Sequence, residues 1–403
     1  MSGGETRAPG APVAEGFIPL SVPEICGNEW AYVKECLDTG WVSSVGSYVE
    51  RFEADMARAT GTRFAVATVN GTAALHTALL VAGVEPDDEV LVSTLTFIAP
   101  ANAIRYVGAW PVFIDADAAT AQMDPDLVAD FLERRCAWSG GRLVNRETGR
   151  RVKAVIPVHV LGHPVDLDPI LTLARARGLK VIEDATESLG ATYRGRRVGQ
   201  LADVACFSFN GNKIITTGGG GMIVTDDEAL AKKARYLTTQ AKDDAVEFVH
   251  NEIGYNYRLT NVLAAIGVAQ LERLTEYVER KRRIAARYSE ACAGIPGLAL
   301  LGEAPWAQAT FWMATARVDA GAFGSDSRAL LRALEERRIQ TRPLWQPMHL
   351  SPAHAGSPRC GGAVAEALNR DCLTLPCSVG MTEPEQGRVI DALRQSCRSR
   401  GAR

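Results

Sequence analysis

Between residues 63 and 183 the chain alternates short apolar runs with segments whose apolar residues recur at helical spacing. The apolar runs lie at 63–68, 89–93, 111–114, 154–159 and 179–183, and the helical patterns between them at 72–81, 99–106, 125–135 and 167–177. A parallel strand can follow another only through a crossover, which is usually a helix. The alternation therefore predicts an α/β fold with a mostly parallel sheet between helices.

A second segment, residues 202–225, suggests chemistry. An apolar run at 204–209 contains Ser208, and it is followed by Lys213, by four glycines at 218–221, and by a second apolar run at 221–224. A lone lysine among apolar and small residues is expensive to keep charged, and a neutral amine is what a Schiff-base lysine needs. The glycines would allow backbone or a cofactor to approach closely. A solvated lysine in a glycine-rich turn explains this segment equally well.

Two further positions fit a cofactor site. Asp184 follows the run at 179–183, at the carboxyl edge of the predicted sheet, where α/β sheets bind ligands. A carboxylate there can keep a pyridine nitrogen protonated and so maintain pyridoxal phosphate (PLP) as an electron sink, although an aspartate that caps the next turn is an equally common case. The run at 63–68 breaks at Asn70-Gly71 before a helix that begins at Thr72, which predicts a phosphate site at the helix N-terminus.

Composition excludes several classes of function. The chain has 403 residues, is 47% hydrophobic, and has a net charge of −3 from interspersed charges, which gives no electrostatic footprint for nucleic acid. No apolar run reaches the ~18 residues that span a bilayer, and the N-terminus has no apolar signal core. The nine cysteines form no C-x-x-C pair, so we expect a cytoplasmic protein without a metal site or disulfide framework.

Several motifs resemble those of the PLP-dependent nucleotide-sugar aminotransferases of the DegT/StrS type. They are N-G-T-A-A-L, T-F-I-A-P-A-N-A-I, P-V-H-V-L-G, E-D-A-T-E-S-L-G-A, S-F-N-G-N-K and G-Y-N-Y-R-L-T, and the resemblance extends from residue 18 to about residue 394. The segments 18–29, 40–46, 145–160 and 210–223 look most like the subgroup that aminates carbon 4 of UDP- or GDP-linked 4-keto-6-deoxy-N-acetylhexosamines. The run of four glycines, in place of the commoner G-E-G-G, is also similar to that subgroup.

The resemblance implies the fold-type I PLP-dependent aminotransferase architecture. The chain is then expected to have a large PLP-binding domain at residues 18–273 and a smaller C-terminal α+β domain at 274–403. A charged helix from residue 274 would join the two. The Gly/Ala/Pro-rich residues 1–17 are predicted to be a disordered tail. L-Glutamate is the expected amino donor, a nucleotide-sugar is the expected acceptor, and the expected assembly is a homodimer.

The resemblance also implies roles for individual residues. Lys213 corresponds to the Schiff-base lysine and Asp184 to the partner of the pyridine nitrogen. The phosphate would be held by Gly71, Thr72 and Ser208, and Phe97 would stack on the pyridine face, although a core phenylalanine is the alternative.

Other positions have more than one interpretation. Asn256 resembles the residue that crosses the dimer interface to the partner's phosphate, which implies a composite active site. Arg258 fits either substrate or phosphate binding or an interface ion pair. Glu187 replaces the glutamine of many relatives and must be protonated to donate to the cofactor's phenolic oxygen. Trp41, His159 and His349 are expected near the substrate, although structural roles for the two histidines are equally consistent.

Three alternatives remain at this stage. The ketone could belong to a dTDP- or GDP-linked sugar, or to a cyclitol in antibiotic biosynthesis. A sugar 3-dehydratase is disfavoured because relatives with that activity carry histidine in place of the lysine. A non-catalytic PLP-binding regulator is disfavoured because the sequence shows no DNA-binding appendage.

Overall fold

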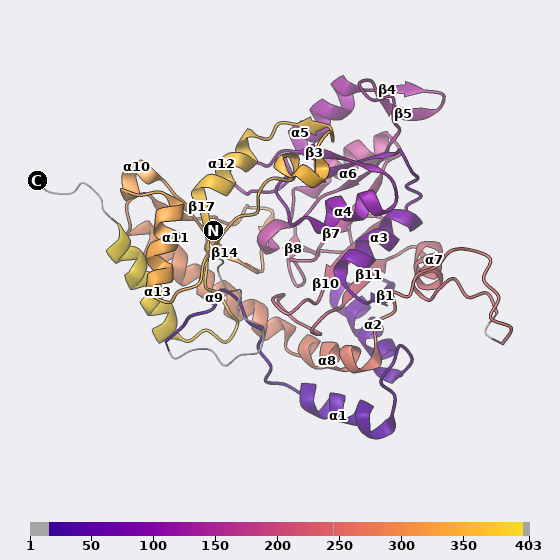
Figure 1. Ribbon diagram of the computed structural model, residues 1–403, viewed down its shortest axis with the longest axis horizontal. Coiled ribbons are helices and arrows are strands. Elements are labelled where there is room, and N and C mark those ends of the chain that lie inside the picture. Colours follow the sequence, from indigo (N-terminus) through magenta and orange to yellow (C-terminus); the bar gives the residue numbers. More distant parts are fainter. Residues whose placement is uncertain (1–15, 245, 398–403) are drawn as a thin grey trace, which may run out of the picture.

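The computed structural model describes residues 16–244 and 246–397 (Figure 1). The predicted disordered tail at residues 1–17 lies outside the described residues except for Gly16 and Phe17, so its disorder stays a prediction. Within the described ranges, no helix is both long and apolar enough to cross a membrane.

The predicted mostly parallel sheet is confirmed. In the described part of the chain it has eight strands in the order β1-β11-β10-β7-β6-β2-β3-β16, and within it only β11 runs opposite to the others. The strands are β1 (Phe64–Thr68), β2 (Glu89–Ser93), β3 (Trp110–Ile114), β6 (Val152–Ile156), β7 (Lys180–Asp184), β10 (Val204–Ser208), β11 (Gly221–Thr225) and β16 (Arg359–Cys360). The central strands are almost wholly buried, as expected for a sheet covered on both faces.

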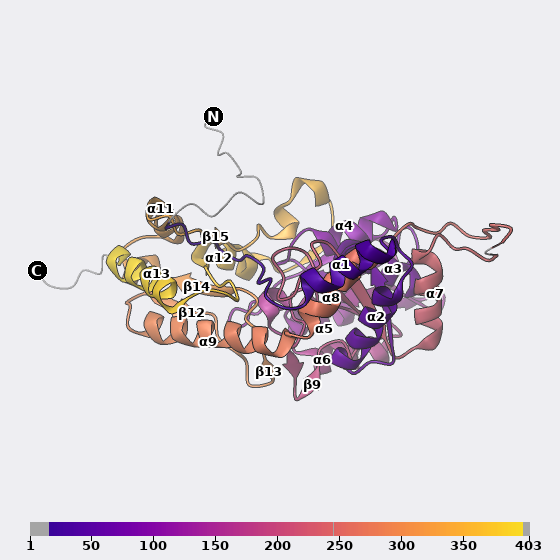
Figure 2. The same cartoon turned by 90° about the horizontal axis from the view of Figure 1, so that it is seen from below.

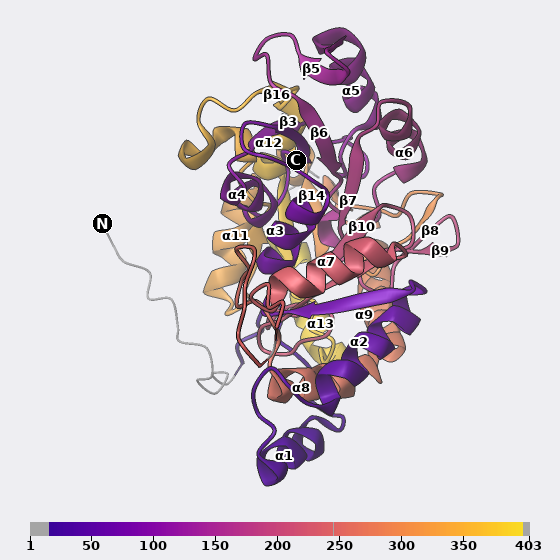
Figure 3. The same cartoon turned by 90° about the vertical axis from the view of Figure 1, so that its right-hand side faces the viewer.

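Helices cover both faces of this sheet. Figure 3 shows α3 and α4 on one side and α5 and α6 on the other. The helices of this half are α1 (Glu29–Thr39), α2 (Ser47–Thr60), α3 (Gly71–Val81), α4 (Ala99–Tyr106), α5 (Pro125–Asp130), α6 (Leu167–Ala176), α7 (Glu228–Thr238) and α8 (Asn261–Leu271). The predicted helix at 125–135 is α5 continued by a π-helix, Phe131–Arg135, and the predicted strand at 154–159 ends at Ile156, before Pro157, which has no N–H to donate.

The C-terminal part builds a second, smaller sheet, which Figure 1 shows beside the large one. Its strands are β12 (Leu298–Leu300), β14 (Ala314–Val318), β15 (Arg342–Pro343) and β17 (Cys372–Leu375), in the order β12-β14-β17-β15. The helices here are α9 (Leu274–Ala293), α10 (Ala320–Phe323), α11 (Ser327–Glu336), α12 (Ala363–Asp371) and α13 (Glu383–Ser396). The long α9 links the two parts, as Figure 2 shows.

Two segments cross the domain boundary predicted at residues 273 and 274. β16 belongs to the C-terminal half but pairs with β3 at the edge of the large sheet. Near the N-terminus, Ile18 exchanges main-chain hydrogen bonds with Arg338 and Gln340, on the small-sheet side. The two parts are therefore connected by these two contacts as well as by helix α9.

Short elements complete the fold. The predicted surface loop or hairpin at 138–151 overlaps a hairpin that begins two residues earlier, formed by β4 (Cys136–Ser139) and β5 (Arg142–Asn145). A three-stranded sheet is formed by β8 (Thr192–Tyr193), β9 (Arg196–Arg197) and β13 (Ala307–Gln308). Three 3₁₀ helices lie at Val160–Gly162, Met348–Leu350 and Pro352–His354 among the described residues.

Candidate active site

A cavity of about 420 Å³ lies at the carboxyl ends of the parallel strands, where the large sheet meets the small one. This is the edge at which α/β sheets bind ligands. Seven predicted site residues line it together: Gly71, Thr72, Phe97, Asp184, Glu187, Ser208 and Lys213. They come from four separate segments of the chain, which the fold brings together in one place.

Lys213 lies in the loop after β10, and its side chain is only 14% exposed. Its main-chain N–H donates to Asn210 O at 3.0 Å, which shapes the turn. The Nζ atom is 3.6 Å from Glu187 Oε1 and 4.1 Å from the centroid of the Trp312 ring. The amine is thus held between a carboxylate and an aromatic face, both of which attract its protonated form.

Asp184 is the last residue of β7 and is 2% exposed. Its Oδ1 accepts a hydrogen bond from Thr186 N at 3.2 Å. Burial raises the pKa of Asp184, while Thr186 and the nearby Lys213 and His159 oppose this effect. A buried carboxylate that faces a cavity is suited to pair with a cationic N–H of a ligand.

The end of the cavity that is predicted to hold a phosphate is formed by the N-terminus of α3 and by Ser208. The Asn70 side chain caps α3 by accepting from Ala73 N at 2.8 Å. A Cβ on Gly71 would lie 2.8 Å from Ser208 Cβ, so this junction accepts only glycine. The unpaired N–H groups of a helix N-terminus together with a hydroxyl form a cradle suited to a phosphate.

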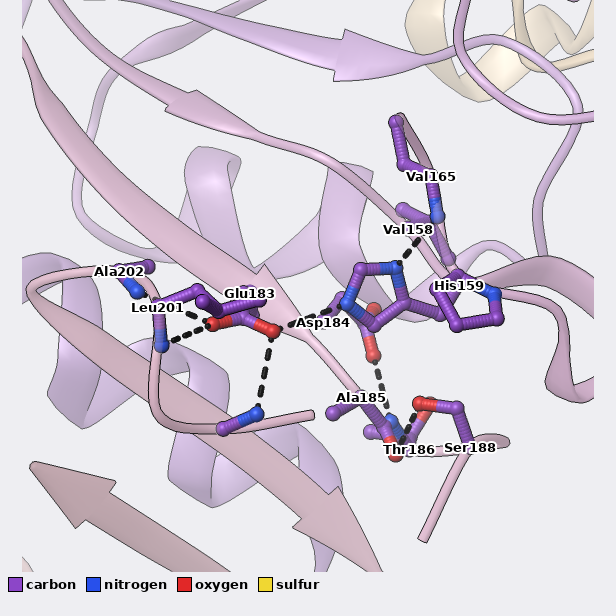
Figure 4. Close-up of polar contacts among 12 residues, drawn as sticks. Val158, His159, Val165, Glu183, Asp184, Ala185, Thr186, Ser188, Leu201 and Ala202 are labelled. Atoms are coloured by element: carbon purple, nitrogen blue, oxygen red, sulfur yellow. Dashed lines mark hydrogen bonds and ion pairs between the residues drawn. The ribbon is translucent and has the colours of Figure 1, made fainter. Parts of the chain in front are cut away.

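His159 does not line the cavity and is fully buried. Its Nδ1 accepts from Val165 N at 3.1 Å, and its Nε2 lies 3.0 Å from Glu183 Oε2 (Figure 4). Because Nδ1 is an acceptor, Nε2 must carry the proton that is donated to Glu183. Glu183 also accepts main-chain N–H groups from the loop at 199–202. These contacts favour the structural interpretation of His159, whose ring lies next to Asp184 (Figure 4).

Trp41 and His349 also lie away from the cavity lining. Trp41 is 57% exposed, and its main-chain O accepts from Asn261 Nδ2 at 2.7 Å. The ring of His349 bonds Thr94 Oγ1 at 2.7 Å and Glu366 Oε1 at 3.0 Å, so both nitrogens already have partners.

The G-Y-N-Y-R-L segment also lies outside the lining. Arg258 forms an ion pair with the buried carboxylate of Glu53, which also binds Arg235 at 2.8 Å. This contact favours an ion-pair role for Arg258, although the pair lies within one chain. Asn256 is exposed, and its backbone bridges to Thr239. An exposed side chain that does not line the cavity of its own chain is consistent with the predicted role across a dimer interface.

Sequence reasoning missed two tryptophans that line the cavity from the C-terminal half. The rings of Trp312 and Trp345 stack with centroids 6.4 Å apart and planes 10° from parallel. Trp312 Nε1 also donates to Asn212 O at 2.7 Å, directly beside the lysine. No local pattern marks these positions, because only the packing of the second sheet brings them to the cavity.

Glu187 offers a test of the site's electrostatics. It is 5% exposed, and its Oε2 accepts from Leu161 N at 2.7 Å. Burial raises its pKa from 4.5 to about 7, because desolvation outweighs the attraction of Lys213. The folded state thus binds the Glu187 proton more tightly than the unfolded state does. This difference contributes to the free energy of unfolding below pH 4.5, and the contribution is lost as the pH rises to 7.

The glutamine in Glu187→Gln does not titrate. The free energy of unfolding of this variant, relative to that of wild type, is therefore expected to increase by about 3 kcal/mol as the pH rises from 4.5 to above 7. Urea unfolding of the cofactor-free chain near pH 5 and pH 8 measures this change. Glu290→Gln, at an exposed carboxylate on α9, is the matched control and should give the same difference at both pH values. A Glu187→Gln difference that does not depend on pH would contradict the prediction.

Comparison with known proteins places this geometry in a family. The model of the DegT/DnrJ/EryC1/StrS aminotransferase family matches residues 23–394. GDP-perosamine synthase of Caulobacter vibrioides is 42% identical over 384 residues, covering 94% of this chain and 98% of that protein. GDP-perosamine synthase of Escherichia coli O157:H7 is 39% identical over 339 residues, covering 84% of this chain and 87% of that protein.

Solved structures agree with the sequence comparison. The crystal structure of DesV from S. venezuelae superposes with a TM-score of 0.83 at 33% identity, covering 93% of this chain and 95% of that one. The fold-type I architecture and the sugar-transaminase class predicted from the motifs are thereby confirmed. The chain belongs to the DegT/DnrJ/EryC1/StrS aminotransferase family.

Proposed function

We propose that this protein transfers the amino group of L-glutamate to the 4-keto carbon of a nucleotide-linked 4-keto-6-deoxyhexose, with pyridoxal phosphate bound in the cavity. The observation that carries the proposal is the placement of Lys213, Asp184 and the α3 N-terminus around one space of about 420 Å³. An amine, a buried carboxylate and a phosphate cradle are the three features that this cofactor requires of a site.

The residues present fit the cofactor. Gly71 leaves room for a phosphate where any side chain would collide with Ser208, and the hydroxyl of Ser208 lines the same space. Asp184, buried at the end of β7, fits the protonated pyridine nitrogen. Phe97 is 56% exposed at the cavity, which leaves its ring free to stack on a planar ligand.

When bound, pyridoxal phosphate supplies an electron sink and carries the amino group between the two substrates. Lys213 Nζ removes the proton from the α-carbon of the amino donor and later delivers a proton to carbon 4 of the sugar. Asp184 holds a proton on the ring nitrogen. Trp312 covers the amine and excludes water from it. Glu187, whose pKa of about 7 leaves it partly protonated near neutrality, can donate from Oε1 while Oε2 remains bonded to Leu161 N.

The choice of sugar rests on the relatives. Perosamine is a 4-amino-4,6-dideoxyhexose, and two relatives that are 42% and 39% identical to this chain are named GDP-perosamine synthases. They support amination at carbon 4 and favour a GDP-linked substrate, with a hydroxyl rather than an acetamido group at carbon 2. The UDP-linked N-acetyl sugar indicated by the sequence motifs, a dTDP-linked sugar and a cyclitol ketone are the competing substrates.

Single-turnover spectroscopy tests the proposal. Protein loaded with pyridoxal phosphate should lose its visible band, at roughly 420 nm by general PLP chemistry, when L-glutamate is added. Keto-sugars are then added one at a time. Return of the band with the GDP-linked 4-keto-6-deoxy sugar supports the proposal, whereas return only with a UDP-N-acetyl sugar, a dTDP-sugar or a cyclitol ketone replaces the substrate. If glutamate causes no change in the band, the proposed donor is wrong.

A further inference from the structure

Lys281 is a buried lysine to which the proposed mechanism assigns no role. It lies on α9 and is 2% exposed. Among the described residues no carboxylate pairs with it, and burial lowers its pKa. A lysine in such a place is unfavourable unless its amine makes a specific contact, because a methionine or leucine could fill the same volume without desolvating a polar group.

The contact that Lys281 makes is with the main chain of Trp312. Its Nζ donates to Trp312 O at 2.8 Å and lies 3.7 Å from Cys377 Sγ. Trp312 precedes β14, and among the described residues no main-chain N–H reaches its carbonyl. Cys377 Sγ, a weak donor, also lies 3.6 Å from this oxygen. The lysine amine is therefore the stronger of two side-chain donors to a carbonyl that the sheet leaves unpaired, and it can donate whether charged or neutral.

The other side of Trp312 contacts the catalytic lysine. Its Nε1 donates to Asn212 O at 2.7 Å, and its ring centroid lies 4.1 Å from Lys213 Nζ. One residue thus connects Lys281, in the helix that joins the two parts of the molecule, with the reactive amine. A small displacement of the Trp312 backbone would uncover Lys213 and change its direction relative to the substrate.

We propose that Lys281 is a positioning residue for the transamination, which fixes the Trp312 backbone so that the indole covers the Lys213 amine. The catalytic part of this inference rests on the proposed function. Its geometric part does not, because the contacts from Lys281 through Trp312 to Lys213 exist in the chain without cofactor or substrate.

The test measures how accessible the Lys213 amine is in the cofactor-free protein. The chain is acetylated briefly with acetic anhydride, and the labelling of Lys213 is measured by mass spectrometry relative to the exposed Lys34 of the same molecule. Lys281→Met removes the donor with little change in volume. Labelling of Lys213 is expected to rise several-fold and to approach that of Trp312→Ala, while the thermal midpoint stays the same or increases.

The matched control is Tyr288→Phe. Tyr288 also lies on α9, and its hydroxyl donates to Pro376 O at 2.8 Å, so this variant removes a comparable buried hydrogen bond without touching Trp312. Its Lys213 labelling should equal that of wild type. If Lys281→Met does not fold, Lys281→Gln, which keeps an N–H donor on a shorter chain, should give labelling between wild type and Trp312→Ala.

Activity of the loaded enzyme gives the second readout. In Lys281→Met the rate constant of the glutamate half-reaction should fall on the order of tenfold, with little change in the glutamate concentration for half-saturation. Unchanged labelling in Lys281→Met, or in Trp312→Ala, overturns the proposal. If the wild-type protein itself does not transaminate, the proposed function fails, while the labelling results still decide whether Lys281 positions Trp312.

Discussion

Replacing Lys213 with alanine is expected to abolish transamination while leaving the fold intact. The side chain ends in the cavity, where Glu187 and the Trp312 ring are the contacts of the amine within the described part of the chain, so its removal breaks few structural contacts. The reaction loses the group that moves the proton in both halves, which should lower turnover by at least about 10⁴-fold. Steady-state turnover and circular dichroism measure the two effects, and Lys34→Ala, at an exposed lysine, is the control. Measurable multiple turnover by Lys213→Ala would refute the assignment.

The same variant can test the proposed homodimer. We expect Asn256→Ala to retain its cofactor poorly during dialysis, if Asn256 binds the phosphate of the partner's site. A mixture of Lys213→Ala and Asn256→Ala chains, unfolded and refolded together, should regain activity. Each mixed dimer then has one site that combines an intact Lys213 with an intact Asn256 from the other chain. No recovery in the mixture, with cofactor occupancy of Asn256→Ala equal to wild type, would contradict the composite site.

Replacing Asp184 with asparagine is expected to have the second-largest effect. The amide keeps the size of the side chain and can still accept from Thr186 N, but it cannot carry the negative charge that keeps a pyridine nitrogen protonated. We expect turnover to fall on the order of 10³-fold. The free energy of unfolding should stay equal or increase at neutral pH, because burial raises the pKa of Asp184 and makes its ionised form unfavourable in the folded chain without cofactor.

The measurements are single-turnover kinetics with glutamate and urea unfolding of the cofactor-free protein. Asp203→Asn is the control, since Asp203 lies beside the same strand but pairs with Lys180 at the opposite end, away from the cavity. A turnover in Asp184→Asn within a few-fold of wild type would exclude the proposed pairing with the ring nitrogen.

The sequence was sufficient for the features that are encoded locally. The alternation of apolar runs and helical patterns predicted the parallel sheet, and the strand ends predicted where Asp184 and the Asn70-Gly71 junction would lie. Lys213, Ser208, Phe97 and Glu187 were predicted from motifs, and the structure places them around the same cavity. Their positions agree with the sequence because a residue that follows the carboxyl end of a parallel strand must lie at the edge where α/β sheets bind ligands. Their roles stay predictions.

The predictions for the two histidines depended on which residues, distant in the sequence, lie next to each ring in the fold. His159 and His349 were expected near the substrate, yet their ring nitrogens bond Glu183, Val165 N, Thr94 and Glu366 instead. A histidine has the same local appearance in both situations. Its role depends on which partners its two nitrogens find in the fold, and those partners lie up to 255 residues away.

Periodicity and motifs of adjacent residues were thus enough to predict the α/β class, the family and the chemical groups of the site. The way in which the Lys213 amine is enclosed follows from the tertiary structure alone. Trp312 and Lys281 lie 99 and 68 residues after Lys213. The Trp312 ring reaches Lys213, and Lys281 reaches Trp312, because α9 and the small sheet pack against the large one. Burial, and with it the cost of an unpaired carbonyl or amine, is created by that packing and has no counterpart in the local sequence.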